Sequence, residues 1–198
     1  MSAVAIPRHG TPAGSRLPHR GTVGMACLII AESAIFTIFV VAYLFYVGKS
    51  LSGPTPRDVL EVPIFFTICL LSSSFTIHSA SKALERDARG VFVALWLATI
   101  ALGAAFLFGT AQEWHRLIYE HGLTISTNLF GTTYYSLVGL HGLHVVVGLM
   151  LMAIVALLAV AGYVGREHSP RIGVLSLYWH FVDVVWVVVF MVVYVIGR

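Results

Sequence analysis

Five long apolar runs, separated by short polar stretches, constrain this chain more than any other feature of its sequence. They cover about residues 23–47, 62–81, 91–112, 132–164 and 172–196, and together they contain two formal charges. A helix that crosses a bilayer needs about 20 predominantly apolar residues, whereas the strands of a membrane β-barrel are alternating segments of about ten. A helix also satisfies its own backbone hydrogen bonds within lipid. The sequence therefore predicts an all-α membrane protein with five transmembrane helices.

The composition supports a membrane location. Hydrophobic residues make up 58% of the 198 residues and charged residues 11%, against about a quarter charged in an ordinary soluble domain. A single soluble core of this size cannot bury so many apolar side chains, so many of them must face lipid. The basic residues lie next to the apolar runs and are not interleaved with aromatic residues on one face. We therefore expect them to face a membrane surface, and we expect no nucleic-acid partner.

The distribution of basic residues predicts the orientation of the chain. Residues 1–21 are polar and rich in proline and arginine, which is typical of a disordered tail, and residues 22–198 hold the five-helix transmembrane domain. With five spans, the tail and the second and fourth loops share one side and carry eight basic residues, while the other side carries four. Because cytoplasmic segments carry the excess of Lys and Arg, we expect the N-terminus in the cytoplasm and the C-terminus outside.

Glu32 is the only formal charge in the first run. It lies about ten residues, or roughly 15 Å, from the start of this span, which places it near the centre of the bilayer. An isolated carboxyl in lipid is neutral, because the ionised form is costly there. Two interpretations stay open: a proton-active carboxyl, or a neutral acid that is hydrogen-bonded to another helix and holds the two together.

His141 and His144 form a second polar feature, in the fourth run. Their spacing of three predicts that both rings lie on one face of a helix, as in some metal sites. Two ligands do not complete a haem or di-iron site, however, and the chain has few carboxylates to add. Glycines 139, 142 and 148 around the pair favour close helix packing with histidine hydrogen bonds across it. We therefore expect Glu32 within hydrogen-bonding distance of one of these histidines, directly or through one water.

The fifth run begins with a polar and aromatic segment that contains Tyr178, Trp179, His180, Asp183 and Trp186. His180 and Asp183 are three residues apart, so they are placed to pair with each other on one helix face. Tyr and Trp are typical of the membrane interface. We favour contacts of this segment with lipid headgroups or a partner, while a neutralised pair that orients the helix remains the alternative.

Two further residues are candidates for contact with lipid or a partner. His78 lies near the cytoplasmic end of the second run, where its simplest interpretation is an interfacial side chain. Glu113 begins a long polar loop, about residues 113–131, that we expect outside the membrane as a solvated segment.

The last two runs resemble the cytochrome c oxidase subunit III family, which also provides subunit III of bacterial quinol oxidases. Residues 178–186 read YWHFVDVVW and are similar to the family's hallmark at every position. Residues 139–148 contain His-Gly-Leu-His-Val, similar to the family's HG-x-H-V motif, and residues 130–135 agree with the stretch before it. Agreement is weaker at 31–33 and 70–76. The resemblance covers about residues 22–197 and fits the shorter, five-helix form of the family.

The resemblance implies a supporting, non-catalytic role in a multi-subunit oxidase of the bacterial cell membrane. Such a subunit holds no haem, copper or other metal, and it packs on subunit I, which carries the haem–copper centre. It supports proton uptake and protects the complex during oxygen reduction. The family's carbodiimide-reactive glutamate falls on Glu32, and an acid of its loop falls on Glu113. Family members also bind phospholipid in a cleft, which in longer members is partly walled by two helices that are absent here.

Three alternatives differ from this interpretation. The first is a subunit III-like accessory protein of nitric oxide reductase. The second is a stand-alone membrane enzyme with a histidine-bound metal, which elemental analysis would detect. The third is a proton channel that uses Glu32, which proton flux in liposomes would detect, although few polar residues are available to line a water-filled path.

Overall fold

The computed structural model describes residues 20–50 and 53–197, and the described part is helical. The long helices are α1 (Arg20–Tyr46), α3 (Ile64–Glu85), α4 (Arg89–Tyr119), α5 (Leu129–Val160) and α6 (Ser169–Phe190), which continues as a π-helix, η2 (Met191–Ile196). The short elements are α2 (Pro56–Val59) and a 3₁₀ turn, η1 (Arg166–His168). Five helical segments are long and apolar enough to cross a membrane, which confirms the predicted number of spans. The predicted disordered tail lies outside the described residues, except that Arg20 and Gly21 belong to α1.

Two helices extend beyond their predicted ends. The predicted loop begins at Glu113, but α4 continues to Tyr119. Leu117 is fully buried, so one face of this polar segment still packs on the bundle and keeps it helical. In the same way, α3 passes residue 81 and ends at Glu85, because Ala83 and Leu84 are buried. Hydropathy alone marks only the part of a helix that lies in lipid, and therefore misses these ends.

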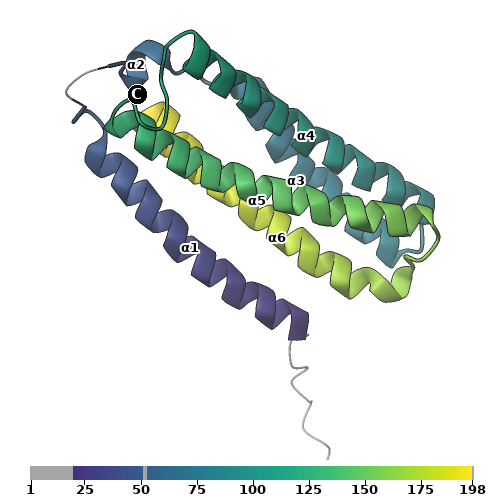
Figure 1. The fold of residues 1–198 in the computed structure, drawn as a ribbon. Helices are drawn as coiled ribbons and strands as arrows, with labels where there is room; N and C mark the ends of the chain where they lie inside the picture. The colour runs from purple at the N-terminus through teal and green to yellow at the C-terminus, as the bar shows by residue number, and fades with distance from the viewer. Residues whose placement is uncertain (1–19, 51–52, 198) are drawn as a thin grey trace, which may run out of the picture.

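Consecutive long helices run antiparallel in the bundle (Figure 1). Of the five long helices, α1 has the fewest buried residues. α3 packs along α4, α5 packs on both α4 and α6, and α1 lies along α5 and α6. The interior is filled with aromatic side chains, the largest of which are Trp96, Trp179 and Trp186. Within α1 only Phe36 and Tyr43 are buried. The core therefore belongs to four helices, and α1 covers one side of it.

Two glycines make room for Trp179 at the centre of the bundle. A Cβ atom added to Gly148 would lie 2.7 Å from Trp179 Cζ3, and one added to Gly103 would lie 2.9 Å from Trp179 Cη2. The prediction of close packing at glycines is thus confirmed at Gly148. It is wrong at Gly142, where an added Cβ meets no atom within 4 Å.

Gly148→Ala will destabilise the chain, whereas Gly142→Ala on the same helix will not. Alanine is favoured over glycine in a helix by about 1 kcal/mol at both positions. At Gly148 the added methyl overlaps a fully buried indole, and overpacking of this kind costs about 1–3 kcal/mol. Thermal unfolding of the purified chain in detergent should rank Gly142→Ala at or above the parent and Gly148→Ala below it. Equal melting temperatures for the two variants would contradict this account of the packing.

The loops gather at the two ends of the bundle, as five antiparallel spans require. The start of α1, the α3–α4 turn and the α5–α6 connection lie at one end, and α2 and the C-terminus lie at the other (Figure 1). The basic residues Lys82, Arg86, Arg89, Arg166 and Arg171 belong to the first end. The fold thus groups the basic segments that the sequence places on one side of the membrane.

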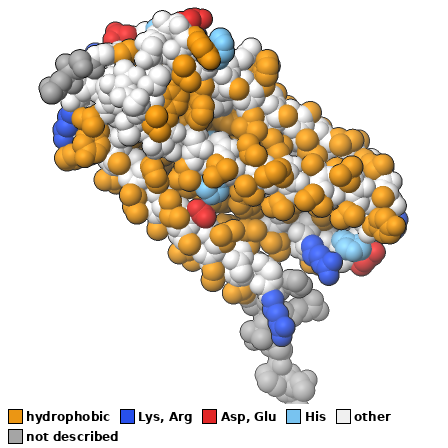
Figure 2. Space-filling model, in the orientation of Figure 1, with side chains coloured by type: hydrophobic (Ala, Val, Ile, Leu, Met, Phe, Trp, Pro, Cys, Tyr) orange, Lys and Arg blue, Asp and Glu red, His pale blue; other side chains and the backbone are white. Residues whose placement is uncertain are grey.

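Between the two ends the surface is apolar. Figure 2 shows hydrophobic side chains along the length of the face in view, with charged side chains mainly toward the ends. Large side chains are widely exposed, among them Ile30 at 71%, Phe75 at 76% and Leu157 at 73%. A surface of this kind would aggregate in water and is suited to lipid or to a membrane partner. The chain is a multi-pass membrane protein.

Candidate functional site

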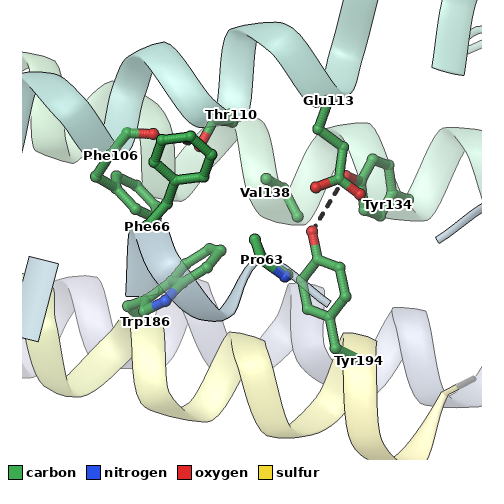
Figure 3. Close-up of a pocket in the computed structure, with 9 residues that line it drawn as sticks. All are labelled: Pro63, Phe66, Phe106, Thr110, Glu113, Tyr134, Val138, Trp186 and Tyr194. Carbon is green, nitrogen blue, oxygen red and sulfur yellow. Dashed lines mark hydrogen bonds between the residues drawn. The ribbon is translucent and has the colours of Figure 1, made fainter. Parts of the chain in front are cut away.

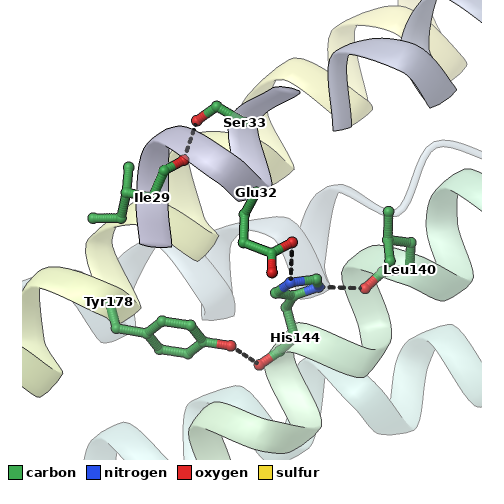
Figure 4. A network of polar contacts seen from close by, with 6 residues as sticks. All are labelled: Ile29, Glu32, Ser33, Leu140, His144 and Tyr178. Atoms are coloured by element: carbon green, nitrogen blue, oxygen red, sulfur yellow. Dashed lines mark hydrogen bonds and ion pairs between the residues drawn. The ribbon is translucent and has the colours of Figure 1, made fainter. Parts of the chain in front are cut away.

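Glu32 from α1 and His144 from α5 meet at membrane depth, and Figure 4 shows their side chains directed toward each other. His144 Nε2 lies 3.2 Å from Glu32 Oε2. The predicted hydrogen-bonding distance between Glu32 and one of the two histidines is therefore confirmed. The side chains of Glu32 and His144 are 23% and 13% exposed, so the pair lies at the edge of the bundle and not in its core.

A backbone carbonyl fixes the orientation of the imidazole ring. His144 Nδ1 lies 2.8 Å from Leu140 O, and Nδ1 must donate in this contact because a carbonyl oxygen only accepts. Nε2 then either accepts from a protonated Glu32 carboxyl or, in an imidazolium, donates to the carboxylate. The pair shares one proton and is neutral overall in both states. A neutral pair of this kind is compatible with a position inside the membrane.

The pair opens into a groove of about 440 Å³ between α1 and α5. The rest of the groove wall is mainly apolar and consists of Leu28, Ile35, Leu140, Leu143, Val147 and Tyr178. The Tyr178 hydroxyl donates to the backbone oxygen of His144 over 3.0 Å, and the ring centroid of Phe36 lies 5.0 Å from that of the imidazole. The groove thus presents one carboxyl and one imidazole to whatever occupies it.

His141 does not share this site. Its side chain is fully buried, 5.0 Å from the ring of Trp186 and 5.7 Å from that of Phe106, between centroids. Neither of its ring nitrogens has a hydrogen-bond partner among the described residues. A spacing of three leaves two side chains about 60° apart around a helix, which is enough to place one ring in the core and the other in the groove. The two histidines are therefore neighbours on α5 with different surroundings, and only His144 contacts Glu32.

The hallmark segment of α6 forms hydrogen bonds with hydroxyl side chains of α3. Trp179 Nε1 donates to Ser73 Oγ over 2.7 Å, and Trp186 Nε1 donates to Thr67 Oγ1 over 3.2 Å. Ser74 Oγ donates to Asp183 Oδ2 and lies 3.0 Å from His180 Nδ1. The predicted direct pair of His180 and Asp183 is thus replaced by contacts of both residues with one serine.

Burial corrects the expectation of lipid or partner contact for Trp179, Asp183 and Trp186, whereas Tyr178 also lines the groove beside Glu32. Trp179 is 0% exposed, Trp186 1%, Asp183 4% and Tyr178 5%. Their polar atoms bond to other helices of the same chain, because a buried N–H or O–H must find a partner. The aromatic side chains therefore fill the interior and do not form a belt at the membrane interface. His180 is only partly buried.

Ser74→Ala will destabilise the chain by about 1–3 kcal/mol, since it leaves a buried carboxyl without its hydrogen bond. The other carboxyl oxygen, Asp183 Oδ1, has no hydrogen-bond partner among the described residues. It therefore cannot compensate for the hydrogen bond that Ser74 donates to Oδ2. Ser81→Ala is the matched control on the same helix, because Ser81 Oγ bonds to the carbonyl of Ile77 within its own helix and, among the described residues, to no other helix. Chemical denaturation in detergent should separate the two variants, and equal stability would refute the role given to Ser74.

The remaining two candidates occupy opposite ends of the bundle. His78 is exposed and lies with Lys82 in a groove beside α6, its ring 6.4 Å from that of His180, so it remains a candidate for contact with lipid or a partner. Glu113 belongs to α4 and not to a loop, and its side chain is 11% exposed. Within the described ranges, no group of three or more His, Cys, Asp or Glu side chains is placed to hold a metal ion.

Comparison with known proteins matches residues 18–198 to the family model described as cytochrome c oxidase subunit III. The chain belongs to the cytochrome c oxidase subunit III family. The match includes every span, the Glu32–His144 pair and the hallmark segment of α6. The resemblance seen in the motifs is therefore confirmed over the whole transmembrane region.

Individual relatives in this family agree over most of their lengths. The chain is 38% identical over 177 residues to cytochrome c oxidase subunit 3 of Synechocystis, covering 87% of this chain and 74% of the relative. It is 35% identical over 169 residues to cytochrome c oxidase subunit 3 of Alkalihalophilus pseudofirmus, covering 84% and 82%. It is 34% identical over 176 residues to cytochrome bo(3) ubiquinol oxidase subunit 3 of Pseudomonas aeruginosa, covering 88% and 84%.

Sequence reasoning missed the hydroxyl groups that receive the hallmark segment. Thr67, Ser73 and Ser74 bond to α6, but in the sequence they are neutral residues within an apolar run. The available signal was their position, since hydroxyl side chains in a transmembrane helix commonly bond across to a neighbour.

Proposed function

We propose that this chain is the third subunit of a bacterial haem–copper terminal oxidase and carries no redox cofactor of its own. The family match over residues 18–198 is the observation that carries this proposal. Subunit III packs on subunit I, which holds the haem and copper and reduces oxygen. Two relatives named above are subunits of cytochrome c oxidases and one of a ubiquinol oxidase. This chain has the corresponding place in such a complex.

In this role the Glu32–His144 pair holds one exchangeable proton at membrane depth. The contact of 3.2 Å supports this assignment, as does the carbonyl of Leu140, which keeps Nε2 directed at the carboxyl. A pair that gains or loses no net charge when the proton moves between its members avoids the cost of a bare charge in lipid. The subunit thereby supports proton uptake and the stability of the complex during turnover.

Phospholipid is the proposed occupant of the grooves beside α1. A second groove of about 400 Å³ lies between α1 and α6, and its wall includes Phe36, Val40, Phe181 and Val188. Together with the groove that contains Glu32, this gives α1 an open apolar groove on each side. Acyl chains fit such walls by chemistry and by shape.

The proposed orientation places the N-terminus and the α3–α4 turn in the cytoplasm. The end that holds the α3–α4 turn carries the larger number of Lys and Arg residues, which is the rule for cytoplasmic segments. The end with α2 and the C-terminus then faces outside. Cysteine substitutions at Ser81 and Thr124, labelled with a membrane-impermeant thiol reagent in intact cells, test this directly: only Thr124→Cys should react.

Affinity purification of this chain in mild detergent, followed by a reduced-minus-oxidised absorption spectrum, tests the proposal. Haem bands that co-purify with a large membrane subunit and with oxygen consumption are the expected result. Nitric oxide reduction by the co-purified partner, or a metal centre on the isolated chain, would overturn it. Crosslinking in the membrane before extraction guards against loss of the subunit to detergent.

A further inference from the structure

A small cavity between α4, α5 and η2 brings together polar groups that the Glu32–His144 pair does not use. The cavity has a volume of about 10 Å³, which is about the room that one water molecule needs. Its polar lining consists of Thr110, Glu113, Tyr134 and Tyr194 (Figure 3). The remaining walls are apolar, with Phe66, Phe106 and Trp186 among them.

The two phenol groups at this cavity are only weakly paired with each other. Tyr134 is 1% exposed and Tyr194 5%, and their hydroxyl oxygens lie 3.4 Å apart, a long hydrogen bond. Glu113 Oε1 is buried and has no hydrogen-bond partner among the described residues. A buried polar atom without a partner is costly, and a water molecule with two to four polar neighbours is the usual remedy.

The local backbone directs these groups into the cavity. Tyr194 lies on the π-helix η2, a rare conformation that is enriched at functional sites. Figure 3 shows its hydroxyl directed toward Tyr134 and Glu113. Glu113 comes from the last turns of α4, in the segment that the sequence suggested was a loop.

Burial favours a protonated Glu113, whereas the charge of Arg116 opposes it. The nearest cation is Arg116, whose Nη2 lies 4.0 Å from Glu113 Oε1, and the same guanidinium pairs with Glu61. The groups that face the carboxyl from α5 and η2 are the phenols Tyr134 and Tyr194, which bring no positive charge. A buried carboxylate that shares its nearest cation with another acid is unfavourable, while a neutral carboxylic acid can both donate and accept a hydrogen bond.

A route to solvent is present at the same residue. Glu113 also lines an open groove of about 310 Å³ between α3 and α4, together with Glu61, Gln112 and Arg116. The groove lies toward the end of the bundle that carries α2, so its polar wall reaches the membrane surface. The Glu113 side chain thus lines both the buried cavity and the outer groove.

We propose that this cavity is a binding site for one water molecule, held by Glu113, Tyr134 and Tyr194, and that the cluster retains a proton which exchanges with solvent through the groove beside α4. The site shares only α5 with the Glu32–His144 pair, and its other residues come from α4 and η2. It depends on the geometry of this chain alone and not on the identity of the partner subunits.

Infrared difference spectroscopy of the full chain, purified in mild detergent with the partners it retains, tests both parts of the proposal. Exchange from H₂O to D₂O should shift the carbonyl band of a protonated carboxylic acid, and Glu113→Gln should remove that band. Glu32→Gln and Asp183→Asn are the matched controls, because they replace the other two acids of the apolar spans and should leave the band in place. If the carbonyl band is unchanged in Glu113→Gln, the proposal that Glu113 is protonated is refuted.

The water is detected separately. Replacement of ordinary water by H₂¹⁸O should shift a sharp O–H band of an isolated water, and Tyr194→Phe should abolish this band and displace the carbonyl band of Glu113. Tyr134→Phe provides a second variant with the same expectation if Tyr194→Phe folds poorly. An isotope-sensitive water band that is equal in the parent and in the phenylalanine variants would refute the site.

Discussion

Glu32→Gln will abolish the labelling of this chain by a hydrophobic carbodiimide. Such reagents attack protonated carboxyl groups in apolar surroundings, and Glu32 is the acid that faces the open apolar groove between α1 and α5. Its 23% exposed side chain is accessible to a reagent dissolved in lipid. Mass spectrometry of peptides from the labelled membrane should find the adduct on Glu32 in the parent and background labelling in the variant.

His144→Ala, in contrast, should not reduce the carbodiimide labelling of Glu32. Without the imidazole, Glu32 has no base to take its proton, so it stays a neutral acid in an apolar groove and labelling persists or increases. Glu113→Gln is the matched control and should leave the Glu32 adduct unchanged, because Glu113 belongs to a different cavity. Undiminished total labelling in Glu32→Gln would show that another carboxyl is the reactive one.

Trp179→Ala will destabilise the chain by about 3–5 kcal/mol, the usual cost of removing a large aromatic side chain from a packed core. The indole is fully buried, packs against Gly103 and Gly148, and donates a hydrogen bond to Ser73. Its removal therefore leaves a cavity at the crossing of α4, α5 and α6. The variant chain should be lost from membranes at growth temperature, and unfolding in detergent should shift to a clearly lower denaturant concentration.

Two milder variants separate packing from hydrogen bonding at this position. Ser73→Ala removes only the acceptor of the indole N–H, and leaving that donor unpaired should cost about 1–3 kcal/mol. Trp179→Phe keeps an aromatic ring in the slot and should fall between Ser73→Ala and Trp179→Ala. If Trp179→Ala were no less stable than Ser73→Ala, the packing role of the indole would be refuted.

The sequence predicted the fold and the central contact because both follow from strong constraints. The length of an apolar run determines that it spans, and the cost of an isolated carboxyl in lipid predicts that Glu32 meets a polar side chain. The structure confirms both predictions, with His144 as the partner.

Which face of each helix is buried could not be predicted in the same way. In a soluble protein, polar residues mark the exposed face of a helix, but here both the lipid-facing and the buried faces are apolar. For this reason Trp179, Trp186 and Asp183 were expected at the surface and are found inside. The cavity at Glu113 was missed for a related reason, since Tyr134 and Tyr194 are about 60 residues apart and only the packed bundle brings them together.

The polar contacts between α6 and α3 have a consequence for how these two helices find their alignment. Lipid tails solvate apolar side chains as well as another helix does, so two apolar helices in a membrane have little to prevent them from sliding along each other. Here Trp186 meets Thr67 near one end of the contact, and Trp179 meets Ser73 further along it. A slide of one helical turn, about 5.4 Å, would separate both pairs at once. The axial position of α6 is thereby fixed within this chain, and with it the height in the membrane at which Tyr194 is presented.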